Sequence, residues 1–439
     1  MPGTASDASL ARPSIDDRAL YRRITRRLIP YLFLLYIVAY VDRVNVGFAA
    51  IDMKRQLSFS DTVYGTGAGI FFLGYALFDL PSNLVMRRVG TRLWIARIMI
   101  TWGLIAALMM FVSSPRSFYI MRFLLGVAEA GFVPGMLLYL TYWFPSHERA
   151  RAVAKFMTAT SLAGVVGGPL SSALLKLDGV AGLQGWQWLF MAEGIPTVLL
   201  GISVLFILKD GPEKADWLRP EEKHWLANEL ERDRAIYGAT KHHALGDAFR
   251  MPAVWMLAGV YVTIQIGVYT VNLWMPLILS GLGDGARDAS LIARYSTVPY
   301  LLAALFTVLI GWSSDRTNER RGHLAGCMVL AAAGFAWVAM ANSVPLALCA
   351  LSLAAIGLWS TMGPFWALMT RTVAGAAAAG GVAMITTLGG FGGFTGPYVT
   401  GRLKEATNSF THGLYAISLI ALGAAILSLA VRQSKATAD

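Results

Sequence analysis

The stretch YIVAYVDRVNVGFAA, residues 36–50, places an acid and a base side by side within an otherwise apolar segment. Asp42 and Arg43 lie in the middle of a run long enough to cross a lipid bilayer as one helix. One charge at the centre of a bilayer costs about 2.5–3.5 kcal/mol on insertion scales. A membrane helix that carries two charges therefore needs partners for them, and those partners indicate a function.

The rest of the chain is similarly apolar. Of its 439 residues, 56% are hydrophobic and only 14% are charged, and the mean hydropathy is +0.55. Apolar runs of about twenty residues, the length of a membrane-spanning helix, recur along it. We predict an all-α membrane protein with twelve transmembrane helices in two six-helix halves. The expected spans lie near 28–50, 62–85, 93–113, 117–142, 151–175, 188–209, 252–280, 290–312, 323–342, 344–370, 377–402 and 410–432.

The net charge of +11 reflects membrane topology rather than nucleic-acid binding. The basic residues lie in short loops between apolar spans, where they determine orientation. With both termini in the cytosol, 27 of the 37 Lys and Arg residues fall on the cytosolic side. This bias predicts a multi-pass plasma-membrane protein with cytosolic termini and no nucleic-acid partner.

One long hydrophilic segment divides the chain into similar halves. The expected parts are a mostly disordered cytosolic tail 1–27, a first half 28–209, a cytosolic loop 210–250, a second half 251–432 and a cytosolic tail 433–439. The loop is expected to form an amphipathic helix from about Glu221 to Ala235, with Trp225 and Leu226 against the membrane or the bundle; a solvated linker helix is the favoured interpretation. In many transporters, two similar halves of this kind surround a binding site near the middle of the membrane.

Metal and enzyme chemistry have little support in the sequence. Cys327 and Cys349 fall in expected spans without disulfide or metal-binding spacing, and all six histidines lie in loops or near span ends. The spans contain no nucleophile–base set and no metal cluster. We therefore expect a protein that is not an enzyme and that holds no metal or organic cofactor.

Two acids and two bases occupy two helices of the first half. Asp42 points about 100° away from its neighbour Arg43 around the helix, so the two can serve different partners. On the fourth span, Arg122 and Glu129 are seven residues apart and share one stripe, about 10 Å apart along the axis. Intramembrane charges of this kind mark substrate, ion or proton pathways.

Their chemistry suggests a division of labour. The guanidinium groups of Arg43 and Arg122 are planar forks that match a carboxylate. The carboxyl groups of Asp42 and Glu129 can gain and lose protons. The alternative is a set of fixed salt bridges between helices, although buried ion pairs stabilise a fold poorly.

Several motifs resemble the major facilitator superfamily. Its cytosolic Gly…Asp-Arg…Arg pattern appears once well and once in degenerate form, with Pro81 where glycine is usual. The good copy consists of Gly311, Asp315, Arg316, Arg320 and Arg321, and the degenerate one of Asn83, Arg87, Arg88, Gly90 and Arg92. Further stretches resemble the anion:cation symporter family, which includes carriers for tartrate, phthalate and 4-hydroxyphenylacetate. These are YVDRVNVGFA (40–49), GYALFDLPSN (74–83), RFLLGVAEAGFVPG (122–135), YWFPSHERARA (142–152), AEGIPTVLLG (192–201), GPFWALMT (363–370) and GGFGGFTGPYVTG (389–401).

The resemblance implies roles for individual residues. It implies proton coupling at Asp42 and Glu129, and anion binding or gating at Arg43 and Arg122. Further candidates to line the cavity, for which core packing is the alternative, are Tyr40, Tyr75, Thr160, Ser161, Trp359, Ser360, Phe365 and Trp366. The residues expected to act in gating are Asp79, Arg87, Arg88, Asp315 and Arg316. Glu193 is expected to be structural.

One departure from the family bears on specificity. Relatives often carry asparagines in the eleventh span, where Thr386 and Gly390 stand here. We expect a wider or less polar cavity and a less hydroxylated anion as a consequence. Together with the buried charges, the resemblance implies a monomeric proton-coupled symporter that imports a tartrate-, hydroxyphenylacetate- or phthalate-like carboxylate across the bacterial inner membrane by alternating access. The alternatives are an efflux carrier or antiporter on the same fold, and a non-transporting anion sensor.

Overall fold

The computed structural model describes residues 15–157, 159–238, 249–282, 288–373 and 377–431, and these residues form helices without any strand. The first half contains α1 (Asp17–Leu57), α2 (Asp61–Val89), α3 (Thr91–Leu108), α4 (Pro115–Glu129), α5 (Phe132–Thr141), α6 (Ser146–Met157), α7 (Ala159–Leu175) and α8 (Gly185–Ile207). The second half contains α11 (Pro252–Ser280), α12 (Ala289–Tyr295), α13 (Thr297–Thr317), α14 (Arg321–Met340), α15 (Val344–Ser360), α16 (Met362–Thr372), α17 (Ala377–Thr407) and α18 (Thr411–Ala430). Helix α9 (Pro220–Gly238) joins the halves.

Eleven helices or helix pairs in the described part of the chain are long and apolar enough to cross a membrane. Three of them are broken into two helices that follow one another within the described residues, namely α4–α5, α12–α13 and α15–α16. Helix α17, with 31 residues, occupies the remaining expected span and packs between α2 and α11. The predicted all-α architecture is therefore confirmed.

Two segments outside the spans differ from the expectation. Asp16 caps α1 by accepting a hydrogen bond from the Ala19 amide at 3.0 Å, so α1 begins at Asp17 and the expected disorder of the N-terminal tail is wrong from there onward. Helix α9 is not a solvated linker either. Its Leu226 is fully buried, and its Trp225 ring lies 6.0 Å from the Tyr21 ring of α1.

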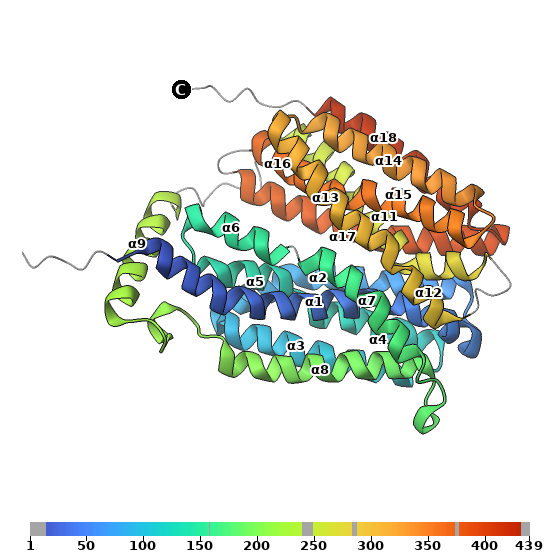
Figure 1. Ribbon diagram of the computed structural model, residues 1–439, viewed down its shortest axis with the longest axis horizontal. Helices are drawn as coiled ribbons and strands as arrows, with labels where there is room; N and C mark the ends of the chain where they lie inside the picture. The colour runs from blue at the N-terminus through green and yellow to red at the C-terminus, as the bar shows by residue number, and fades with distance from the viewer. Residues whose placement is uncertain (1–14, 158, 239–248, 283–287, 374–376, 432–439) are drawn as a thin grey trace, which may run out of the picture.

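Figure 1 shows the two halves side by side, with the first half (blue to green) below the second (yellow to red). The start of α1, the end of α18 and α9 lie at one end of the bundle, which we call the α9 end. The halves meet where α2 packs against α17, α1 against α11, and α7 against α12 and α13. Glycines permit this proximity: a Cβ at Gly65 of α2 would lie 2.4 Å from the Pro397 carbonyl oxygen of α17.

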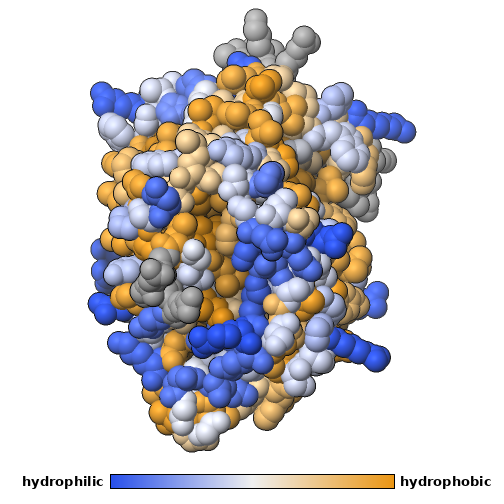
Figure 2. All heavy atoms as spheres, turned by 90° about the vertical axis from the view of Figure 1, so that its right-hand side faces the viewer, coloured by the Kyte–Doolittle hydropathy of each residue, from blue (hydrophilic) through white to orange (hydrophobic). Residues whose placement is uncertain are grey.

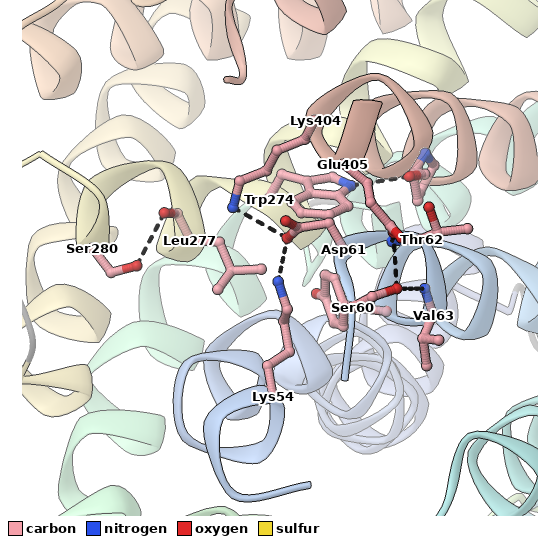
Figure 3. A network of polar contacts seen from close by, with 12 residues as sticks. Lys54, Ser60, Asp61, Thr62, Val63, Trp274, Leu277, Ser280, Lys404 and Glu405 are labelled. Carbon is pink, nitrogen blue, oxygen red and sulfur yellow. Dashed lines mark hydrogen bonds and ion pairs between the residues drawn. The ribbon is translucent and has the colours of Figure 1, made fainter. Parts of the chain in front are cut away.

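A polar network ties the halves together at the opposite end, where α1 ends and α2 begins; we call this the closed end. The Asp61 carboxylate accepts hydrogen bonds from Lys54 of its own half and, at 3.1 Å, from Lys404 of the other half (Figure 3). Glu405 accepts 2.8 Å bonds from the Ser60 hydroxyl and the Thr62 amide at the start of α2. Figure 2 views this end and shows hydrophilic side chains gathered across its middle and lower parts.

Candidate functional site

An ion pair between α1 and α4 forms the centre of the site. The Arg43 guanidinium donates to the Glu129 carboxylate, whose side chain is 1% exposed. Glu129 is the last residue of α4, before the break at Gly131, which adopts a left-handed φ of +87° that suits glycine. The Arg43 guanidinium also lies 5.2 Å from the ring centre of Tyr75 and 5.7 Å from that of Phe71. The cation is thus held by one carboxylate and two aromatic faces.

Arg122 occupies a separate position. Its side chain is fully buried, and its Nε and Nη2 donate to the carbonyl oxygens of Gly67 and Ala68 on α2, at 3.4 and 3.2 Å. The ring of Phe71 lies 4.9 Å from the guanidinium carbon, and Nη1 is buried without a hydrogen-bond partner. Arg122 therefore joins α2 to α4 and keeps one donor unused.

Asp42 faces away from Arg43, as the helix geometry predicted. Its carboxylate accepts hydrogen bonds from the Trp102 indole of α3 and, at 3.0 Å, from the Asn45 amide. The same Asn45 nitrogen donates to Glu193 of α8 at 2.7 Å. Asp42 is thus part of a buried polar cluster between α1, α3 and α8, separate from the Arg43–Glu129 pair.

Tyr40 takes part in a polar chain that crosses between the halves. Its hydroxyl accepts from the Asn272 amide of α11 at 3.4 Å, and the Asn272 oxygen accepts from the Tyr300 hydroxyl of α13 at 2.7 Å. A Cβ at Gly47 would lie 2.6 Å from the Asn272 carbonyl oxygen, so α1 and α11 are in close contact here. The chain lies one helical turn from Arg43.

The second-half candidates pack closely. Trp359 is buried and meets the Tyr300 ring edge-on at 5.6 Å. The Ser360 hydroxyl is buried without a partner. Phe365 and Trp366 pack against the ring of Tyr261, at 5.1 and 5.5 Å. The side chains of two other candidates, Thr160 and Ser161, lie outside the residues that the structure describes.

The departures in the eleventh span have a packing explanation. The Thr386 hydroxyl donates to the Val382 carbonyl of its own helix at 2.9 Å. A Cβ at Gly390 would lie 3.0 Å from the Cβ of Ala76 on α2. Gly390 therefore permits the contact between α2 and α17, which provides a reason for glycine that does not require a wider cavity.

The expected gating residues lie apart from one another. The Asp79 carboxylate accepts from the Gly131 amide at 3.1 Å, so it caps the start of α5 rather than pairing with Arg87 or Arg88, which are exposed. Asp315 pairs with Arg320 at 2.7 Å within the second half. Arg316 lies over the Trp312 ring at 5.4 Å, also within that half.

Sequence reasoning missed several polar members of the site. Asn45 lies three residues after Asp42, a spacing that shares a helix face. Glu193, expected to be structural, is a charge within a span, and such a charge is a signal for a polar cluster. Asn272 interrupts an apolar run of α11, and this interruption is the sequence signal that marks it. Trp102 gave no signal, because a tryptophan in a membrane helix usually packs. Within the described residues no group of three His, Cys, Asp or Glu side chains is arranged to hold a metal ion.

Membrane-length helices in two halves, with ionisable side chains buried at their centre, are the architecture of a secondary transporter. The chain belongs to the major facilitator superfamily, whose family model matches residues 32–397. It is a transporter rather than an enzyme, and its relatives are consistent with the anion:cation symporter group.

Two curated relatives and one solved structure illustrate the similarity. A protein of Agrobacterium vitis named "Putative tartrate transporter" is 46% identical over 95% of this chain and 92% of its own length. A "Quinolone resistance transporter" of Acinetobacter baumannii is 42% identical over 94% of this chain and 95% of its own length. A bacterial homologue of the lysosomal transporter Spinster, in an inward-facing and occupied conformation, shares the fold with a TM-score of 0.77, at 18% identity over 95% of this chain and 99% of that one.

Proposed function

We propose that the protein is a proton-coupled symporter that imports a small organic carboxylate across the bacterial inner membrane. The observation that carries this proposal is the Arg43–Glu129 ion pair, buried between aromatic rings at the centre of the first half. It combines a permanent cation that matches a carboxylate with an acid that can take up a proton.

The pair suggests how the two solutes are coupled. A substrate carboxylate that binds the Arg43 fork displaces Glu129, which then lacks its cation in a buried position. An unpaired buried carboxylate is unfavourable, so Glu129 takes up a proton. A monoanion with one proton, or a dianion such as tartrate with two protons, then leaves the carrier electrically similar to the empty carrier, in which Arg43 and Glu129 neutralise each other. Both forms can therefore change conformation, whereas the anion-bound form without the proton carries an unfavourable charge.

The charge bias of the loops supports an orientation for this cycle. If the basic side is cytosolic, both termini and α9 face the cytosol and the closed end faces the exterior. The described conformation is then shut toward the outside by the Asp61 network. Substrate entry from outside requires that Lys404 and Glu405 separate from α2, which is the expected event of alternating access.

The substrate class rests on similarity and on the lining of the site. The tartrate name of a relative with 46% identity supports a small carboxylate. Aromatic side chains around Arg43 suit a compact or ring-shaped acid, so tartrate, phthalate and 4-hydroxyphenylacetate are the compounds to test.

Efflux is the second candidate function. The relative with 42% identity is named for quinolone resistance, and a quinolone carries a carboxylate. The same ion pair can serve an exporter in which proton entry drives exit of an anion. A non-transporting anion sensor has less support, because no described segment forms a further domain.

Uptake into proteoliposomes tests these alternatives. We expect radiolabelled tartrate, phthalate or 4-hydroxyphenylacetate to accumulate against its gradient when the outside is acidic, and to equilibrate without a pH gradient. An interior-negative potential adds about 2.3 kcal/mol per 100 mV for each net positive charge that enters. Accumulation of the labelled anion in vesicles with an acidic interior would indicate the exporter, and absence of proton-dependent movement of all three acids would reject the symport.

A further inference from the structure

Two buried carboxyl groups share one amide nitrogen in the polar cluster of the first half. The Asn45 Nδ2 atom lies 3.0 Å from Asp42 Oδ1 and 2.7 Å from Glu193 Oε2. Because both oxygens contact the same nitrogen, they are no more than about 5.7 Å apart. All three side chains are buried, with 1–6% of each residue exposed. Two negative charges this close, away from water, would repel each other strongly.

Cations near the pair do not compensate two negative charges. Arg43 lies on the other face of α1 and binds Glu129, and Arg122 of α4 binds carbonyl oxygens of α2 while attracting the Asp42 charge. The charged residues of α3 are Arg92, which pairs with Asp210, and Arg97, which lies over Trp94.

The remaining neighbours of the pair carry no positive charge. Helix α7 contributes no ionisable residue to this contact, and Glu193 is the one charged residue of α8. Glu129 of α4 adds repulsion at Asp42. Among the described residues, neither Asp42 nor Glu193 makes an ion pair.

The hydrogen bonds distinguish the two acids. Asp42 receives two donors, from the Trp102 indole and the Asn45 amide. Glu193 receives one, and its Oε1 atom is buried without a partner. A buried carboxylate keeps its charge where more donors stabilise it, and a protonated carboxyl group tolerates fewer. The charge therefore belongs on Asp42 and the proton on Glu193.

We propose that Glu193 is a positioning residue that carries a proton in this conformation and, through Asn45, leaves Asp42 as the single charge of the pair. The consequence for coupling rests on the proposed symport. Asp42 then takes up a proton during the cycle, in addition to the one that Glu129 binds, and later releases it. Glu193 keeps its own proton throughout. The balance is one proton bound to an Asp42 oxygen and later returned to water, with no other bond changed.

Infrared spectroscopy of the purified full-length protein tests the proposal without any transport assay. We expect a carbonyl absorption of a protonated carboxyl group at neutral pH that E193Q removes. In D42N the Glu193 band should still be present in acid. As the pH is raised, it should disappear at a lower pH than in the wild type, because the negative charge of Asp42 no longer opposes the loss of the Glu193 proton. The matched control is E129Q, which removes an acid of the same half that pairs with Arg43, and which should leave the Glu193 band in place.

The outcomes separate this proposal from the symport itself. The assignment is overturned if E193Q removes no band. It is also overturned if the Glu193 band disappears at the same pH in D42N as in the wild type. Both conclusions hold even if uptake is proton-driven. The infrared result stands if uptake turns out not to depend on protons. As a second measurement, E193Q should show roughly fivefold more uptake than E193A, because glutamine reproduces the neutral acceptor that Asn45 needs; equal uptake by the two variants counts against the proposal.

Discussion

Arg43 of α1 donates to Glu129 of α4, whereas Asp42, one residue earlier, accepts hydrogen bonds from Trp102 of α3 and from Asn45 on a different face of α1. Adjacent residues of one helix thus serve two separate polar clusters. The four charges that the sequence assigned to one constellation are divided in the fold: an ion pair, a carboxyl cluster, and an arginine bound to carbonyl groups. This division allows different variants to affect different steps.

Neutralising the acid of the central pair should uncouple transport. In E129Q, Arg43 keeps its place for the anion but no proton can bind at position 129. We expect concentrative uptake to be abolished while exchange of labelled for unlabelled substrate continues. D42N should behave in the same way. Counterflow and pH-driven uptake in the same proteoliposomes provide the measurement; an unimpaired gradient in both variants would contradict the proposed coupling.

Replacing Arg43 by lysine should impair binding although the charge is kept. Lysine lacks the planar fork that binds a carboxylate through two parallel hydrogen bonds. We expect R43K to reduce substrate affinity by about tenfold or more, corresponding to about 1.4 kcal/mol. Binding to detergent-purified protein measures the effect, with R116K, on the first turn of α4 away from the pair, as control. Equal affinity of R43K and wild type would exclude Arg43 as the anion site.

The network at the closed end should hold the halves together. Removing Lys404 leaves Asp61 with Lys54 alone, so the link between the halves weakens. Because the ion pair is partly exposed, we expect a loss of about 0.2–1 kcal/mol, which is up to about a fivefold shift toward the open form.

The rate at which an impermeant maleimide labels the thiol of T62C reports this opening. Cys327 and Cys349 are replaced by alanine in the same protein. K404A should label faster than wild type, and the difference should shrink at high salt. R402A removes an exposed cation from the same helix and is the control. Faster labelling in R402A than in K404A would argue against the network.

Gly65 should be required for closure. A side chain there would lie 2.4 Å from the Pro397 carbonyl oxygen, a backbone atom that cannot rotate away. Overpacking of this kind costs about 1–3 kcal/mol. We expect G65V to reduce uptake about tenfold while the protein stays folded, because the clash is between the halves. G326V is the matched control, since nothing lies within 4 Å of a Cβ at Gly326; wild-type uptake by G65V would contradict the close contact.

Helix α9 should stay docked at neutral pH and loosen in acid. Partial burial acts against the charged form of Asp233, but hydrogen bonds from Ser146 and the charge of Arg149 outweigh it and lower the pKa of this carboxyl group below 3.8. A lowered pKa contributes stability above the unfolded pKa, and this is lost as the pH falls through the folded value. Docking should therefore weaken only below about pH 4.

Hydrogen exchange of α9 in the purified protein measures this docking. D233N should increase exchange in α9 at neutral pH, whereas E231Q, on an exposed position of the same helix, should not. Protection of α9 that is the same in D233N and wild type would show that apolar contacts such as Leu226 are sufficient.

The sequence by itself determined the membrane architecture. The length and spacing of apolar runs predicted the spans, because a helix must satisfy its backbone hydrogen bonds within lipid. It also identified Asp42, Arg43, Arg122 and Glu129, because charges in such runs are costly and rare. The helical repeat further indicated that Asp42 and Arg43 face different partners.

The tertiary structure alone decided the pairing. Which side chains meet depends on how helices distant in sequence cross, and no local pattern carries that information. Asn45 and Glu193 come together because α1 and α8 pack, and Lys404 reaches Asp61 because the halves approach through Gly65 and its neighbours. The sequence shows which residues are charged. Which partner stabilises each charge depends on how the helices pack against one another.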